Sequence, residues 1–171
     1  MNHVDNEGRL YAPAVRAAMV HFTHDGDTLP FESAAALRTA ANAVERLRAR
    51  GSESRGGLSS GALDLLIRLS VAGAEGIAIG DLATSAGVSP RNATGLLDTL
   101  ERDGLAARQP HESDRRSVRA KITPTGGQWV DAFRRPSEVA MGALFRGFDA
   151  DELALLRHLC LKVAANADTL G

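Results

Sequence analysis

Apolar residues recur every three or four positions in several separate stretches of the chain, which is the spacing of one face of an α-helix. The spacing predicts a helix over about 15–22, a second over about 32–50, and a third that begins near Ala62 and ends near Gly73. Turn-forming residues separate these stretches, with HDGDTLP at 24–30 and GSESRGG at 51–57. We expect the first to end a helix and the second to form a flexible connector.

Two further helices are predicted close together in the middle of the chain. The apolar positions of the first are Ile79, Leu82, Ala83 and Ala86. Gly87 is expected to end it in the left-handed conformation, and only GVS separates it from the next helix. That helix has a clear start signal, with Ser89 as N-cap and Pro90 at the first helical position, and Gly104 ends it. Its apolar positions are Ala93, Leu96, Leu97 and Leu100. Two short helices joined by a tight turn predict a helix-turn-helix.

Short strands are predicted on both sides of this motif. GIAIG at 76–80 precedes it, and LAARQP and SVRAKIT follow it as a hairpin around HESDRR. Thr123 and Pro124 then repeat the cap signal and start a long helix, which Pro136 is expected to kink or break. The fold class is therefore mainly α with a small β-hairpin.

The last predicted helix begins with Asp149 and Glu152 as a capping box. An apolar seam with alternating spacings of three and four follows, at Leu153, Leu156, Cys160, Val163 and Ala167. Such a seam is suited to packing against another helix, and a second subunit could supply it. We interpret Cys160 as a small core hydrophobe, because free cysteine is among the most buried residue types.

Composition indicates one folded domain in the cytoplasm. The 171 residues are 44% hydrophobic and 24% charged, and there is a single cysteine, with no signal region and no apolar run long enough for a membrane span. A net charge of −1 argues against a nucleic-acid partner over the whole chain. Locally the balance differs, because the hairpin segment 105–123 has a net charge of +3. Its charged residues are Arg108, Arg115, Arg116, Arg119 and Lys121, against Glu112 and Asp114.

Residues 79–126 resemble the MarR (multiple-antibiotic-resistance regulator) family of bacterial transcription factors. The similar features are Leu82 with Ala83, Thr94, Leu100 with Glu101, Gly104 with Leu105, the DRR of 114–116, and Thr123 with Gly126. The resemblance implies a winged helix-turn-helix at 58–123, with dimerisation helices at 1–57 and 124–171 in one compact domain. It further implies a homodimer on a pseudo-palindromic double-stranded DNA operator, acting as a repressor that a small aromatic or phenolic ligand releases.

The second helix of the motif carries polar groups that suit a DNA groove. Ser89, Arg91, Asn92 and Thr94 occupy its opening turns, and hydroxyl, guanidinium and amide groups bond phosphates and base edges. Gly95 lies where many relatives carry an arginine. It is interpreted either as a tolerated packing glycine or as a point of close approach to DNA.

The tip of the hairpin is the second predicted DNA contact. By the resemblance, Arg116 enters the minor groove beside Arg115, and Asp114 braces the loop through an ion pair. A solvated charge run is the competing interpretation, which the adjacent helix-turn-helix makes less attractive.

The sequence gives weaker evidence for other kinds of functional site. His21 and His24 lie near Asp25 and Asp27, but a solvated helix end explains them better than a metal site. We expect no cofactor and no enzymatic activity, since no catalytic arrangement of residues stands out. The rival to a DNA-binding regulator is a winged-helix module that serves only protein contact or dimerisation.

Overall fold

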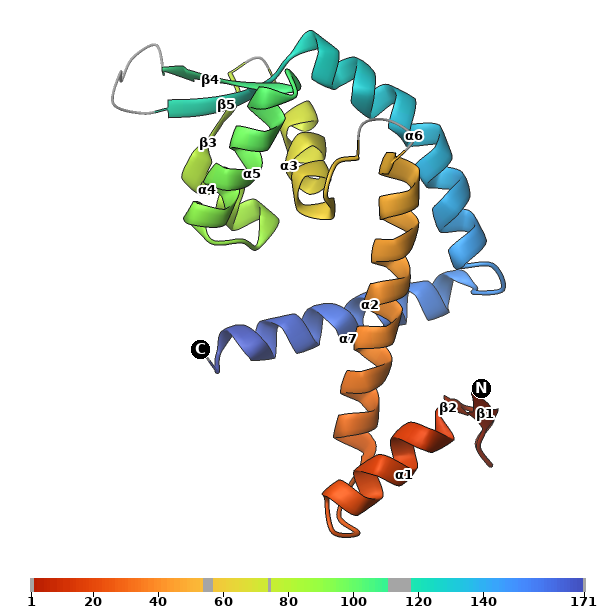
Figure 1. Cartoon of the computed structure of the whole chain (residues 1–171). Helices are drawn as coiled ribbons and strands as arrows, with labels where there is room; N and C mark the ends of the chain where they lie inside the picture. The colour runs from red at the N-terminus through yellow and green to blue at the C-terminus, as the bar shows by residue number, and fades with distance from the viewer. Residues whose placement is uncertain (1, 54–56, 74, 111–117, 171) are drawn as a thin grey trace. The chain divides into compact units, whose positions relative to one another are not determined.

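The structure is a computed structural model that describes residues 2–53, 57–73, 75–110 and 118–170. Over these residues the chain forms seven helices and two small antiparallel sheets (Figure 1). This is the predicted fold class, mainly α with a small β-hairpin. The chain divides into two compact units, one formed by Met1–Val44 with Arg146–Gly171 and the other by Glu45–Phe145.

The first unit contains both ends of the chain. Its elements are β1 (His3–Val4), β2 (Leu10–Tyr11), α1 (Pro13–Phe22), most of α2 (Leu29–Glu53) and α7 (Ala150–Asp168). The Arg16 guanidinium joins α1 to α2 through an ion pair with Glu32, with Nε 3.0 Å from Oε2. The rings of Phe22 and Phe31 meet edge to face, with centroids 5.6 Å apart. These side-chain contacts link α1 to the start of α2.

Helix α2 is longer than the sequence predicted at both ends. It begins at Leu29, whose N–H donates to the Asp27 carboxylate at 3.0 Å, and Pro30 is tolerated because it lies in the first turn. At the other end the helix continues through Gly51 to Glu53, so the expected connector at 51–57 was too long. A glycine costs a helix only about 1 kcal/mol, which the rest of this long helix can absorb.

Helix α7 begins with the predicted capping box. Asp149 accepts from the Glu152 N–H at 2.8 Å, and the Glu152 side chain accepts from the Asp149 N–H at 2.9 Å. None of its residues is buried, and Leu156 and Val163 of the seam are 38% and 52% exposed. Cys160 is half-buried rather than in a core, because the apolar seam has no cover within the unit. The prediction of a core cysteine is therefore wrong for the single chain.

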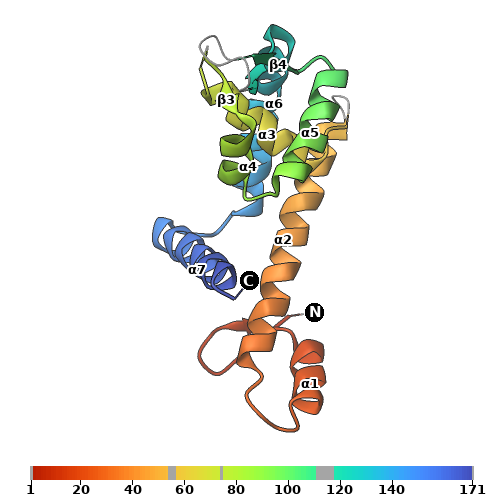
Figure 2. The ribbon, with the colours of Figure 1, turned by 90° about the vertical axis from the view of Figure 1, so that its left-hand side faces the viewer.

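The second unit holds the main hydrophobic core. Its elements are the end of α2, α3 (Ser60–Val71), β3 (Ile77–Ala78), α4 (Ile79–Ala86), α5 (Pro90–Arg102), β4 (Ala106–Pro110), β5 (Val118–Ile122) and α6 (Pro124–Leu144). Helices α3, α4 and α5 pack together, as both views show (Figures 1 and 2). Buried core residues are Leu58, Ala62, Leu65, Leu66, Leu69, Leu82, Ala83, Ala93, Leu97, Leu100, Leu105, Ala106 and Ala120. The apolar positions predicted for α3, α4 and α5 therefore form one core.

The second sheet has the strand order β3-β5-β4. The hairpin pairs Ala106 with Ile122 and Pro110 with Val118, and β3 pairs Ile77 with Ala120. The hairpin is the predicted one, although Leu105 precedes β4 as a buried residue instead of starting it. Strand β4 lies at the edge of the sheet, on the side of α5.

The start of α6 lies against the start of β4. Thr123 is its N-cap, accepting from the Gly126 N–H at 3.0 Å and donating its hydroxyl to the Gly104 carbonyl at 2.7 Å. The Thr123 N–H donates to the Leu105 carbonyl at 3.0 Å. Helix α6 continues through Pro136, so this proline does not break it as one prediction allowed. A proline inside a helix removes one backbone hydrogen bond, which the long helix tolerates here.

We predict that Gly126→Ala destabilises the protein, because the added Cβ would lie 2.1 Å from the Leu105 carbonyl oxygen and 2.8 Å from Cγ1 of Ile122. The free energy of unfolding, from urea denaturation at fixed protein concentration, should fall by about 1–3 kcal/mol or more. Gly127→Ala is the matched control, since its Cβ meets nothing within 4 Å. This change should raise the free energy of unfolding by up to about 1 kcal/mol. Equal effects at the two positions would contradict this packing.

Candidate nucleic-acid interface

The helix-turn-helix is formed by α4 and α5 as the sequence predicted. Gly87 ends α4 with φ 65° and ψ 31°, the left-handed conformation that a glycine adopts without strain. Its N–H donates to the Thr84 carbonyl at 3.1 Å, and the Val88 N–H donates to the Ala83 carbonyl at 3.1 Å. Ser89 and Pro90 then start α5 directly. The short turn fixes the direction in which α5 leaves α4.

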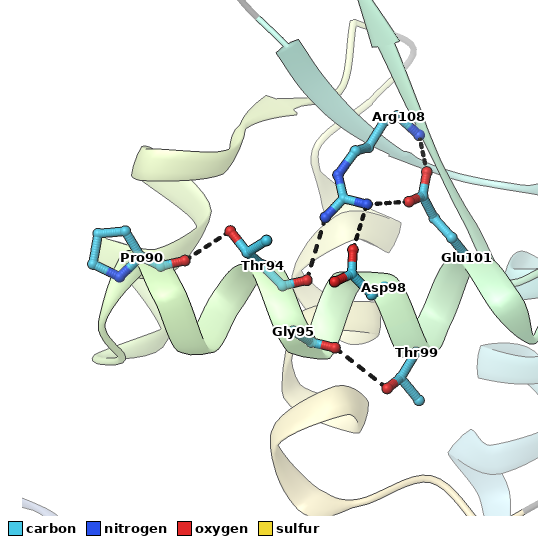
Figure 3. Close-up of polar contacts among 7 residues, drawn as sticks. All are labelled: Pro90, Thr94, Gly95, Asp98, Thr99, Glu101 and Arg108. Atoms are coloured by element: carbon cyan, nitrogen blue, oxygen red, sulfur yellow. Dashed lines mark hydrogen bonds and ion pairs between the residues drawn. The ribbon is translucent and has the colours of Figure 1, made fainter.

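The opening turns of α5 present their polar side chains to solvent. Ser89, Arg91, Asn92 and Thr94 are all exposed. The Ser89 hydroxyl accepts from the Asn92 N–H at 3.2 Å and keeps its own proton to donate. The Thr94 hydroxyl donates to the Pro90 carbonyl at 2.9 Å, so its oxygen is left to accept (Figure 3). The structure therefore places all four residues at one end of one helix, with the Arg91 guanidinium and the Asn92 amide facing outward.

Gly95 is exposed on the same helix, and an added Cβ there would meet nothing within 4 Å. Packing inside the chain therefore does not require glycine at this position. The interpretation of Gly95 as a packing glycine therefore has no support from contacts within the chain. The helix surface at this position is unobstructed, as close approach to DNA would need.

Arg108 on β4 forms the densest polar cluster of the interface (Figure 3). Its Nη1 lies 2.7 Å from Oδ1 of Asp98 and also pairs with Oε2 of Glu101. Its Nη2 donates to the Thr94 carbonyl at 3.2 Å. The Arg108 backbone N–H donates to Oε1 of Glu101 at 2.6 Å, which satisfies a donor on the edge strand. The side chain of Arg108 thus ties the hairpin to α5 at three points.

Arg119 is also used inside the fold. Its Nη2 donates to the Gly76 carbonyl at 2.9 Å, and its Nε is buried with no hydrogen-bond partner among the described residues. Arg108 and Arg119, two of the basic residues behind the net charge of segment 105–123, therefore make contacts within the chain. Their guanidinium groups are matched by carboxylates or a carbonyl within the chain.

The predicted wing tip, with Asp114, Arg115 and Arg116, lies outside the described residues. The described strands β4 and β5 lead to it and away from it. The roles of these three residues therefore stay predictions from the resemblance.

Sequence reasoning missed the cluster of Asp98, Glu101 and Arg108. A signal was available, because two carboxylates three positions apart on a helix proposed to face DNA require a cation to offset their repulsion. Arg108 is the second basic residue after them in the chain, and Arg102 is the first. Arg102 intervenes by number but pairs with Asp103, at 3.3 Å, rather than with either carboxylate.

The described part of the chain also bears on membrane spans and metal sites. None of the helices there combines the length and apolarity that crossing a bilayer requires. Within the same residues, no group of three or more His, Cys, Asp or Glu side chains is placed to hold a metal ion. His21, His24, Asp25 and Asp27 are all exposed.

The sequence that forms α3, α4, α5 and β4 matches the model of a known protein family. Residues 58–118 match the model of the MarR family. Over these residues the chain is similar to proteins of the MarR family. The matched segment covers α3, both helices of the helix-turn-helix and strand β4.

Individual proteins are also similar to this chain. The chain is 35% identical over 98 residues to the transcriptional activatory protein BadR of Rhodopseudomonas palustris, covering 57% of this chain and 56% of BadR. The chain thus spans just over half of the length of this relative. Among solved structures, CouR of Rhodococcus jostii bound to p-coumaroyl-CoA superposes with a TM-score of 0.70 at 24% identity, over 81% of this chain and 96% of CouR.

A second solved structure is Sco3205 of Streptomyces coelicolor, a MarR family transcriptional regulator in complex with DNA. It superposes with a TM-score of 0.72 at 19% identity, over 80% of this chain and 88% of Sco3205. At such identities the likeness establishes the fold alone. The fold is the winged helix-turn-helix of MarR proteins.

We predict that Gly95→Ala stabilises the protein by up to about 1 kcal/mol, because alanine is the better helix former and the site is open. Urea denaturation measures the free energy of unfolding. Gly61→Ala in α3 is the comparison at a crowded site, since its Cβ would lie 3.1 Å from Cδ1 of Leu96. This change should raise the free energy of unfolding less than Gly95→Ala. A clear loss of stability at Gly95 would reveal a packing role that the open surface excludes.

Proposed function

We propose that the protein is a sequence-specific DNA-binding transcriptional regulator that acts as a homodimer. The observation that carries the proposal is the face of α5 that carries Arg91, Asn92 and Thr94, exposed in a MarR-family winged helix-turn-helix. A helix of this kind fits the major groove of B-DNA, which is wide enough to admit it. The relatives support it, since BadR is a transcriptional activatory protein and Sco3205 was solved with DNA.

Each residue of the site has a proposed role. Ser89 and Thr94 bond phosphate oxygens, Asn92 pairs with an adenine edge, and Arg91 contacts guanine or a phosphate. Gly95 lets the helix approach the groove closely. At the wing, Arg115 and Arg116 reach the minor groove and Asp114 braces the loop.

The uncovered apolar seam supports a homodimer. A helix whose leucines are this exposed in the chain requires a partner surface, and a second copy brings two recognition helices to two half-sites about one DNA turn apart. The division into dimerisation segments at 1–57 and 124–171 around 58–123 belongs to the same proposal. So does a cytoplasmic location, where the DNA of a bacterium lies.

A small ligand is the proposed regulator of DNA binding. CouR binds p-coumaroyl-CoA, a phenolic acyl compound, which supports an aromatic or phenolic ligand here as well. Repression relieved by the ligand is the direction that the family resemblance implies, while BadR is named as activatory. A promoter-reporter assay measures the direction. No cofactor and no catalytic step form part of the proposal.

Selection from a randomised duplex library tests the function. The wild-type chain should enrich one pseudo-palindromic sequence, and affinity for a scrambled duplex should fall steeply with salt as phosphate counterions are released. If no sequence is enriched and affinity at low salt is negligible, the protein is a winged-helix module for protein contact instead.

We predict that Asn92→Ala lowers affinity for the enriched duplex by about 1–3 kcal/mol and leaves affinity for the scrambled duplex nearly unchanged, since it removes a base contact. Arg91→Ala should act likewise or, if its partner is a phosphate, weaken both duplexes and reduce the salt slope by about one unit. Fluorescence anisotropy titrations measure both. Arg102→Ala, near the end of α5, is the control, and intact affinity in the Arg91 and Asn92 variants would refute the groove assignment.

We predict that replacing Leu156 and Val163 with arginine separates the dimer into folded monomers, because both side chains are exposed in the chain and would be buried only between subunits. Light scattering at micromolar concentration measures the mass, and circular dichroism measures helix content. Arg157→Ala on the same helix is the control, because an exposed arginine contributes little to an apolar seam. A wild-type monomer, or unfolding of the double variant, would contradict the intermolecular seam.

A further inference from the structure

The cluster around Arg108 joins the two elements that the proposed function assigns to two different grooves of DNA. Helix α5 carries the major-groove residues, and β4 is the first strand of the wing hairpin. Among the described residues, the Arg108 side chain makes its contacts to α5, at Asp98, Glu101 and the Thr94 carbonyl. The contacts come from one side chain and span two turns of the helix, so they fix both the rotation and the axial position of α5 against the strand.

We propose that Arg108 is a positioning residue for DNA recognition, which holds the wing strand in one register on the recognition helix so that both reach their grooves together. This inference rests on the proposed function. It assigns to Arg108 an action through α5 and β4, not a contact with DNA.

The geometry favours positioning over a phosphate contact. The Arg108 side chain is 26% exposed and the Glu101 side chain 29%, so their ion pair is partly shielded from water. A guanidinium has five donors in a rigid planar fork, and here Nη1 and Nη2 already point at three oxygens. Three of the five donors are therefore used within the chain, and two carboxylates already offset the charge of the guanidinium.

The position of Asp98 adds a second reason. Arg91, Thr94 and Asp98 follow one another at spacings of three and four, and all are exposed. The Asp98 carboxylate therefore shares a stripe with two of the proposed DNA-contacting residues and would repel DNA phosphates. The Arg108 guanidinium 2.7 Å away offsets this charge.

The experiment must separate the positioning role of Arg108 from the effect of its charge. Removing Arg108 alone would also change the electrostatic field at the DNA surface. The double variant Arg108→Gln/Glu101→Gln keeps the net charge and removes the main ion pair. The swap Arg108→Glu/Glu101→Arg also keeps the net charge and restores a pair with reversed polarity. The matched control is Arg48→Gln/Asp64→Asn, which removes a charge-neutral pair of similar exposure between α2 and α3.

The readout is the ratio of affinities for the duplex that the wild-type chain enriches and for a scrambled duplex, with thermal unfolding of each variant. We expect the glutamine double variant to lower the ratio about tenfold, comparable to losing one good base contact, through weaker binding of the enriched duplex. Its affinity for the scrambled duplex and its salt slope should match the wild type, because the net charge is unchanged. The swap should recover only part of the ratio, because it restores the pair with residue 101 but not the contacts to Asp98 and the Thr94 carbonyl. The control pair should leave the ratio unchanged.

Other results would overturn the inference. An unchanged ratio in the glutamine variant, or an equal loss in the control pair, would mean that Arg108 has no positioning role. Equal weakening on both duplexes with a smaller salt slope would mean that Arg108 contacts phosphate. If the glutamine variant does not fold, a folded swap variant decides by keeping or losing the ratio. Failure of the wild-type chain to enrich any sequence would instead overturn the proposed function itself.

Discussion

The face of α5 that carries Ala93, Leu97 and Leu100 must lie against the leucines of α3 and α4, because all three side chains are fully buried there. An α-helix has only one direction opposite to its buried face, so this burial decides which residues face solvent. The polar groups of Arg91 and Asn92 point outward as a consequence of the core. The same core includes leucines of α3 and the start of the hairpin, and Ile77 of β3 packs against it, so most of the unit depends on it.

The hairpin is joined to this core at its base rather than along the full length of its strands. Leu105 lies in the core, and its carbonyl accepts from the Thr123 N–H while Gly126 packs against it. Strand β4 is an edge strand, and its Arg108 N–H is satisfied by a carboxylate from α5 instead of by another strand. An edge that is paired in this way does not offer that donor to a foreign strand.

Local signals in the sequence were enough to predict most of the fold. Ser89 with Pro90, Thr123 with Pro124, and Asp149 with Glu152 mark helix starts because the first backbone N–H groups need acceptors from nearby residues. The extent of α2 and the course of α6 through Pro136 were not predictable in this way, since long helices absorb one unfavourable residue. The Arg108 cluster was missed because it joins a helix to a strand through tertiary geometry. No pattern within one chain could predict what covers the exposed apolar seam of α7, and the wing tip lies outside the described residues.

The open surface at Gly95 has a consequence for the evolution of a regulator of this kind. Single-nucleotide changes convert a glycine codon into codons for alanine, valine, arginine or an acidic residue, and no atom within 4 Å of the added Cβ opposes them. A lineage can therefore change the chemistry of its helix surface at this position in one mutational step, with the scaffold unaltered. Gene duplication followed by such a step would give two paralogues that share a fold and diverge in the sites they occupy.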